Sequence, residues 1–183
     1  MEYKERRRYI QTETVCLCRI IQTVYFLLAD GDEMKDGFSD WSKWRDRKGL
    51  DRLEYPGVYA IALSDADIAG KAFSWRPEVI YVGMTNAKGG LKSRLQQFDN
   101  TIKGGEGHGG GHRVRYKYPD YGKLAPRLYV SVNPHECDVE SNQPDDLRIM
   151  GEVAKHEYEC FAVFAETFKR LPEFNDKKKS PKK

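Results

Sequence analysis

The sequence predicts a small α/β fold of the α+β class, in which a three-stranded, mixed or antiparallel sheet is flanked by helices. Short apolar runs of strand length occur at 58–63, 79–82 and 128–132. Apolar side chains recur at helical spacing over 91–102 and again near the C-terminus. The chain has 183 residues, of which 39% are hydrophobic and 32% charged, so it fits one domain with short extensions.

The chain is expected to divide into three segments. Residues 1–50 form an N-terminal helical extension packed on the core, because the spacing of Trp41 and Trp44 is compatible with a helix. Residues 51–176 form the main domain, and 177–183 form a basic tail with five lysines. Without that tail, the remaining 26 basic and 28 acidic residues carry a net charge of −2. A nucleic-acid partner must therefore be argued from local patches.

The middle of the chain alternates regular segments with loops. The helix at 91–102 is predicted by apolar residues at intervals of four, three and four: Leu91, Leu95, Phe98 and Ile102. A glycine-rich loop is expected at 104–111. After this loop, alternation with basic residues favours a strand or ribbon through Val114, Tyr116 and Tyr118.

The last element has the clearest pattern, a helix of about five turns or more that ends before Pro172. Its apolar face contains Met150, Val153, Glu157, Phe161, Phe164, Phe168 and Leu171. Glu157 is the one carboxylate on this face, whereas Glu152 and Glu159 lie off it. A buried carboxylate must be paired, hydrogen-bonded or bound to a metal ion, so both an ion pair and a metal site are open explanations.

Three further features are ambiguous when each is taken alone. The loop at 85–90 contains two glycines and leads into the helix with Arg94, which could bind a phosphate or simply be a turn with a surface arginine. Tyr59 and Tyr81 each lie inside a predicted strand, where core packing is their ordinary role. If they are buried, their hydroxyls need partners.

Together these features resemble one family. Gly57-Val58-Tyr59 and Tyr81-Val82-Gly83 resemble the two short motifs that name the GIY-YIG nucleases. An arginine on the next helix (Arg94 in LKSRL), a glutamate on a later helix (Glu157) and an asparagine after a proline (Asn175 in LPEFN) follow in the same order. The resemblance covers 56–175 and is to stand-alone, restriction-enzyme-like members.

The resemblance implies a metal-dependent endonuclease that hydrolyses DNA phosphodiester bonds. Tyr59 or Tyr81 would orient or deprotonate the attacking water. Arg94 would bind the scissile phosphate as charge builds on it. Glu157 would hold one divalent ion, Mg²⁺ or Mn²⁺, with waters and phosphate oxygens completing its shell. Asn175 would position the phosphate or form the wall of the site.

The sequence departs from the family at two positions. Met84 stands where the family often has a lysine after the second motif, and Lys88 could supply that cation. Phe98 stands where many members have tyrosine or histidine, and His108 or His112 could fill that space.

Basic and aromatic residues mix between 112 and 129, as on surfaces that follow a nucleic-acid backbone. The expected DNA contacts there and in the preceding loop are His108, His112, Arg113, Arg115 and Lys117. The alternative is a two-faced ribbon with one solvated basic side. Two other functions stay open: a non-catalytic DNA-binding module on the same fold, and an interaction protein in which the tyrosines and Glu157 form a satisfied polar core.

The remaining expectations concern the environment of the protein. Four cysteines, Cys16, Cys18, Cys137 and Cys160, show no disulfide framework and no zinc-ligand spacing, so reduced thiols and a cytoplasmic location are expected. The apolar run at 15–28 is too short and too polar to span a bilayer, so no membrane association is expected. The sequence does not distinguish a monomer from a homodimer.

Overall fold

A computed structural model describes residues 37–176. In chain order the elements are β1 (Ser42–Lys43), the 3₁₀ helix η1 (Trp44–Gly49), β2 (Gly57–Leu63), β3 (Val79–Thr85), α2 (Gly90–Ile102), α3 (Gly109–Lys117), α4 (Tyr121–Leu124), the 3₁₀ helix η2 (Ala125–Arg127), β4 (Leu128–Pro134) and α5 (Pro144–Phe168). The expectations for the helical part of the N-terminal extension, for Cys16 and Cys18 and for the basic tail lie outside the described residues.

The strands form one antiparallel sheet in the order β1-β4-β2-β3, which confirms the α+β class. The three expected strands are present, and β1 is a fourth. It has only two residues, Ser42 opposite Val130 and Lys43 opposite Tyr129, which is too short to produce a hydrophobic pattern. Residues from 37 to 50 therefore contribute a strand to the main domain, where the sequence had predicted only a packed extension.

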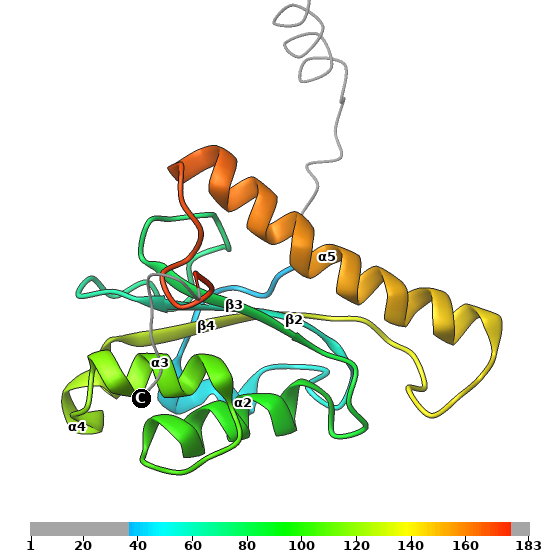
Figure 1. The fold of residues 1–183 in the computed structure, drawn as a ribbon, viewed down its shortest axis with the longest axis horizontal. Helices are drawn as coiled ribbons and strands as arrows, with labels where there is room; N and C mark the ends of the chain where they lie inside the picture. Colours follow the sequence, from blue (N-terminus) through cyan, green and yellow to red (C-terminus); the bar gives the residue numbers. More distant parts are fainter. Residues whose placement is uncertain (1–36, 177–183) are drawn as a thin grey trace, which may run out of the picture. The chain divides into compact units, whose positions relative to one another are not determined.

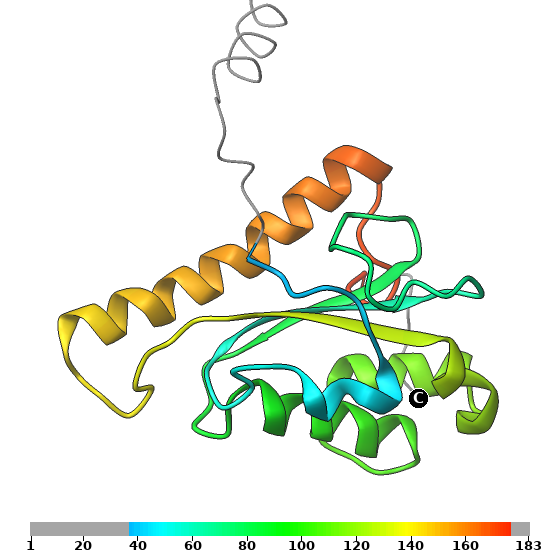
Figure 2. The ribbon, with the colours of Figure 1, turned by 180° about the vertical axis from the view of Figure 1, so that it is seen from behind.

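Helices cover both faces of the sheet (Figures 1 and 2): α5 lies on one face, and α2 and α3 lie on the other. Alternate residues of each strand supply the two cores, as the pleat requires. Tyr59, Ile61 and Tyr81 face α2, whereas Val58 and Ala60 face α5. This two-sided burial explains why the strands read as continuous apolar runs in the sequence.

The long C-terminal helix is confirmed and begins earlier than its apolar pattern indicated. Pro144 occupies its first turn, where the missing N–H costs nothing, and two aspartates there complement the helix dipole. Val153, Cys160 and Phe164 form its buried face. Leu171 lies beyond the helix end and is exposed, so its expected place on that face was wrong.

The expected strand or ribbon through Val114, Tyr116 and Tyr118 is wrong, because 109–117 form α3. The buried positions of α3 are Gly110, Gly111 and Val114, which are spaced as one helical face. Glycines contribute nothing to a hydrophobic pattern, so the helical period was invisible in the sequence.

The C-terminal segment protects the edge of the sheet formed by β3. Phe174 N–H donates to the Ile80 carbonyl at 2.9 Å. The Asn175 side chain pairs with both backbone groups of Val82, since its oxygen accepts at 2.8 Å and its amide nitrogen donates at 2.7 Å. The segment thus occupies hydrogen-bonding groups that an edge strand leaves open. In the described part of the chain, no helix is both long and apolar enough to cross a membrane.

Candidate active site

The two motif tyrosines lie side by side on β2 and β3, on the face of the sheet that α2 and α3 cover. The ring centroids of Tyr59 and Tyr81 are 6.0 Å apart. Two glycines make room for them. A Cβ on Gly83 would lie 2.5 Å from the Tyr59 hydroxyl, and one on Gly110 would lie 2.4 Å from the Tyr81 ring. The glycine of the second motif is therefore required by packing, and so is a glycine at the start of α3.

His108 holds the hydroxyl of Tyr59. Gly111 N–H at the start of α3 donates to His108 Nδ1 at 3.1 Å, so the ring caps the helix. His108 Nε2 lies 2.7 Å from the Tyr59 hydroxyl. Because Nδ1 accepts a hydrogen bond from the backbone, the neutral ring carries its proton on Nε2, and Nε2–H donates a hydrogen bond to the Tyr59 oxygen.

Burial, followed by the nearby Arg94 charge, lowers the pKa of His108 to about 3, so the ring is neutral at physiological pH. His108 is fully buried, so the solvated-loop alternative is wrong for it, and its side chain is not exposed for a direct nucleic-acid contact. It instead packs against Phe98, with ring centroids 5.0 Å apart, in the space that the family resemblance reserved for a tyrosine or histidine.

Both phenols keep their protons at neutral pH. Burial raises the pKa of Tyr59 well above its usual value, and the Tyr81 charge adds to the rise while Arg94 opposes it. Burial also raises the pKa of Tyr81, opposed first by Arg94 and reinforced by the Glu157 charge. Hydrogen bonding with Tyr59 and the charge of Arg113 act to lower the pKa of Tyr81. Arg94, Arg113, Glu157 and Tyr59 therefore all act on the pKa of Tyr81. Of the two tyrosine rings, that of Tyr81 is the more accessible.

Two arginines bring positive charge to this cluster. Arg94 on α2 donates to the Gln97 side chain at 3.2 Å, and Arg113 on α3 donates to the Gly109 carbonyl at 3.3 Å. The Nε atoms of both arginines are buried and have no hydrogen-bond partner within 37–176. Neither guanidinium forms an ion pair with a described carboxylate. Arg76 and Arg127 have the same atom without a hydrogen-bond partner elsewhere in 37–176, but the two in this cluster lie beside paired tyrosines, where an added acceptor would satisfy both.

Glu157 contributes the one carboxylate whose charge acts on Tyr81. It lies on α5 between the buried residues Val153 and Cys160 and is itself half-buried. Glu152 and Glu159 are exposed, as the register predicted. We name Tyr59, Tyr81, Arg94, Arg113 and Glu157, together with His108, the tyrosine–arginine cluster.

The structure does not bring every expected residue into this cluster. Lys88 is exposed and pairs with Glu140 at 2.7 Å, and it is not among the groups that act most strongly on the two tyrosines. Both the oxygen and the nitrogen of the Asn175 amide bond to Val82, so Asn175 supports the strand that carries Tyr81, and one amide hydrogen remains beyond these two bonds.

Most basic residues of the expected DNA-contacting ribbon are used internally. His112 pairs with Glu106 at 2.8 Å, and Arg115 donates to the carbonyls of Thr101 and Gly105. Lys117 pairs with Glu173. Two of the five expected contacts, His108 and Arg113, belong to the tyrosine–arginine cluster. Of these two, Arg113 has the unsatisfied donor.

The start of α2 does not form a phosphate cradle. The backbone N–H groups of Leu91 and Lys92 donate to the carbonyls of Tyr55 and Leu53 at 3.0 and 2.7 Å. Gly90 has a φ of +56°, and a Cβ there would lie 2.3 Å from the Glu54 carbonyl oxygen. The glycines at 89–90 thus allow close packing against the preceding loop, which is the ordinary-turn explanation.

No group of three or more His, Cys, Asp or Glu side chains within 37–176 is placed to hold a metal ion. A single half-buried carboxylate still fits Mg²⁺, because that ion keeps several waters and takes one or two carboxylates together with substrate phosphates. Glu157 would be the protein's ligand in such a site.

Comparisons with protein-family models, with curated proteins and with solved structures found no match to this chain. The resemblance to GIY-YIG nucleases therefore rests on its own residues. Sequence reasoning weighed a place for His108 beside Phe98 and missed the role of Arg113, which it treated as one contact among many. No signal in the sequence separates Arg113 from its neighbours, because the glycines at the start of α3 hide its helical phase.

Proposed function

We propose that this protein is a metal-dependent endonuclease that hydrolyses DNA phosphodiester bonds at the tyrosine–arginine cluster. One observation carries the proposal: beside the paired rings of Tyr59 and Tyr81, the buried Nε atoms of Arg94 and Arg113 have no hydrogen-bond partner within 37–176. The charges of both arginines and of Glu157 act on the pKa of Tyr81. Two cations with unsatisfied donors suit a phosphate, and a carboxylate suits a divalent ion that binds the same phosphate.

The division of labour follows from burial and protonation. Tyr81 keeps its proton and is slightly accessible, so it orients the attacking water by hydrogen bonding. Tyr59 is fully buried and acts as a positioning residue, because His108 fixes its oxygen and leaves its hydrogen directed elsewhere. Arg94 and Arg113 stabilise the negative charge that grows on the phosphate oxygens. A divalent ion held by Glu157 would supply charge stabilisation for the leaving oxygen.

The decisive experiment incubates supercoiled plasmid with the full chain in Mg²⁺, in Mn²⁺ and in EDTA. We expect nicking or discrete fragments that require the metal and that disappear in Glu157→Gln and in Arg94→Gln. The matched control is Glu159→Gln, because Glu159 lies on the same helix, is exposed and pairs with Lys155.

Each outcome has a defined meaning. Discrete fragments would establish a site-specific enzyme, and nicking alone would establish a structure-specific or nonspecific one. Plasmid binding without cleavage in either metal would replace the proposal with the non-catalytic DNA-binding module. Equal activity in Glu157→Gln and Glu159→Gln would remove Glu157 from the site.

A further inference from the structure

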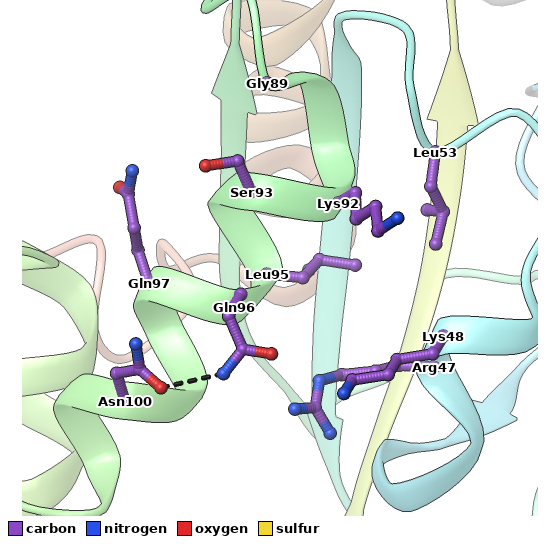
Figure 3. Close-up of a pocket in the computed structure, with 10 residues that line it drawn as sticks. All are labelled: Arg47, Lys48, Leu53, Gly89, Lys92, Ser93, Leu95, Gln96, Gln97 and Asn100. Atoms are coloured by element: carbon purple, nitrogen blue, oxygen red, sulfur yellow. Dashed lines mark hydrogen bonds between the residues drawn. The ribbon is translucent and has the colours of Figure 1, made fainter.

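A second site lies on the same helix as Arg94. A pocket of about 690 Å³ opens between α2 and η1 (Figure 3). Its lining combines three cations, polar side chains and two apolar residues: Arg47, Lys48, Leu53, Gly89, Lys92, Ser93, Leu95, Gln96, Gln97 and Asn100. No acidic side chain is among these residues.

Two of the three cations that line the pocket have no ion-pair partner within the described residues. Lys48 and Lys92 are exposed, and neither forms an ion pair with another residue of 37–176. Arg47 is different, because it is buried, bonds to Asp99 at 2.8 Å and so forms a fixed wall. In Figure 3, Lys92 extends from α2 toward Leu53, while the side chains of Arg47 and Lys48 extend from η1 toward α2. A ligand in this pocket is therefore expected to be an anion.

The other lining groups restrict the kind of anion. Leu53 and Leu95 provide an apolar floor, and both are buried. Gln96 donates to Asn100 at 2.7 Å, which leaves further donors and acceptors of the two amides open to a ligand. A nucleotide combines the required parts, since it has a phosphate, a flat base with an apolar face and polar edges that amides recognise.

The pocket is connected to the tyrosine–arginine cluster through one side chain. Gln97 lines the pocket and accepts a hydrogen bond from Arg94 at 3.2 Å. The hydrogen bond joins the two sites through residues one turn apart on α2.

We infer that this pocket binds a nucleotide of the nucleic-acid substrate away from the cleaved bond, with its phosphate at the exposed lysines Lys48 and Lys92. The inference rests on the proposed function for the identity of the substrate. The pocket would be a second binding site for the substrate strand, at a distance from the phosphate that reacts.

The test measures binding separately from cleavage. A fluorescein-labelled DNA duplex is titrated with the full chain in EDTA, and anisotropy is recorded at several salt concentrations. In the double variant Lys48→Gln/Lys92→Gln we expect binding to weaken about tenfold or more at low salt. The slope of log K against log salt should fall by about 0.9, because the two lysines bind one phosphate and each phosphate contact contributes about 0.9.

The matched control is Lys71→Gln/Lys169→Gln, which removes the same charge from two exposed lysines that do not line the pocket. The control should keep the wild-type affinity and slope. Equal weakening in both double variants would overturn the inference, since only net charge would then matter. Failure of the wild-type chain to bind the duplex would also overturn it.

The outcomes separate this inference from the proposed function. If the wild-type chain cleaves plasmid and the pocket variant binds as tightly as the control, the pocket is overturned and the nuclease stands. If the chain binds DNA without cleaving it, and the pocket variant alone binds weakly, the nuclease is overturned and the pocket stands.

Discussion

Two polar clusters of the domain, the one around Asp99 and the tyrosine–arginine cluster, differ in whether their hydrogen bonds are satisfied. Around Asp99 every partner is present: Trp44 Nε1 donates at 2.8 Å, Arg47 at 2.8 Å, Lys103 at 2.7 Å and Tyr121 at 3.0 Å. In the tyrosine–arginine cluster, two guanidinium nitrogens have no partner within the described residues.

This difference indicates that the Asp99 cluster stabilises the fold, whereas the tyrosine–arginine cluster has donors available for a ligand. Burial acts to raise the pKa of Asp99, but its hydrogen bonds from Lys103 and Trp44 and the charge of Arg47 outweigh that effect and lower it. Asp99 is thus ionised and complete without any addition. The tyrosine–arginine cluster maintains buried donors at a cost in stability that a bound phosphate would offset.

The largest expected effect comes from breaking the complete cluster. Asp99→Asn should lower the free energy of unfolding by about 3–5 kcal/mol, because Arg47 would be left buried without its countercharge. Chemical denaturation monitored by circular dichroism measures the change. Asp65→Asn is the control, since its ion pair with Arg127 is exposed and should contribute little. A loss no greater than that of the control would show that the Asp99 network is not what stabilises this face.

Next in size is the loss of an unsatisfied donor from the tyrosine–arginine cluster. Arg94→Gln and Arg113→Gln should each reduce plasmid cleavage by about 10²–10³-fold, equivalent to about 2.7–4 kcal/mol. Neither should lower stability, because neither guanidinium is ion-paired to a described carboxylate. Cleavage rates and melting temperatures are measured on the same samples. A large fall in melting temperature with unchanged cleavage per folded molecule would mean that the two clusters share one structural role.

The third effect depends on pH and arises from His108. Its pKa is about 3 in the folded chain, whereas an unfolded histidine titrates near 6.5. Below about pH 6.5 the unfolded chain binds a proton that the folded chain does not, so stability should fall as the pH is lowered from about 6.5 toward about 3. The contribution is about 1.4 kcal/mol per pH unit.

Urea denaturation at several pH values, in the wild-type chain and in His108→Gln, measures this slope. The variant keeps a polar side chain at the site but does not titrate, so its stability should depend less on pH over this window. His135→Gln serves as a comparison, because burial and His156 also lower the pKa of His135 at a site outside the tyrosine–arginine cluster. Parallel slopes in the wild-type chain and His108→Gln would contradict the assignment of a buried neutral ring.

The smallest effect is expected at Lys88. Lys88→Ala should leave plasmid cleavage nearly unchanged, because its ammonium group is exposed and pairs with Glu140. The measurement is the same nicking assay, with Arg113→Gln as the contrasting variant. A loss as large as that of Arg113→Gln would return Lys88 to the site and would mean that this loop rearranges on DNA.

The sequence by itself determined the main features of the fold because its signals are local. Continuous apolar runs predicted the three longer strands, and regular spacing predicted α2 and most of α5. The resemblance also placed Tyr59 and Tyr81 side by side, and their ring centroids are 6.0 Å apart; the catalytic roles of Arg94 and Glu157 stay predictions.

Tertiary structure alone decided which polar groups are satisfied, because hydrogen-bond partners come from segments distant in the chain. Residues 49 apart join at the Tyr59–His108 hydrogen bond, and 93 residues separate Asn175 from its partner Val82. No local pattern distinguishes Arg113, which has an unpaired nitrogen, from Arg115, which donates to two carbonyls. That distinction appears only in the folded chain, where Gly110 of α3 packs against Tyr81 and Gly111 packs against Thr101.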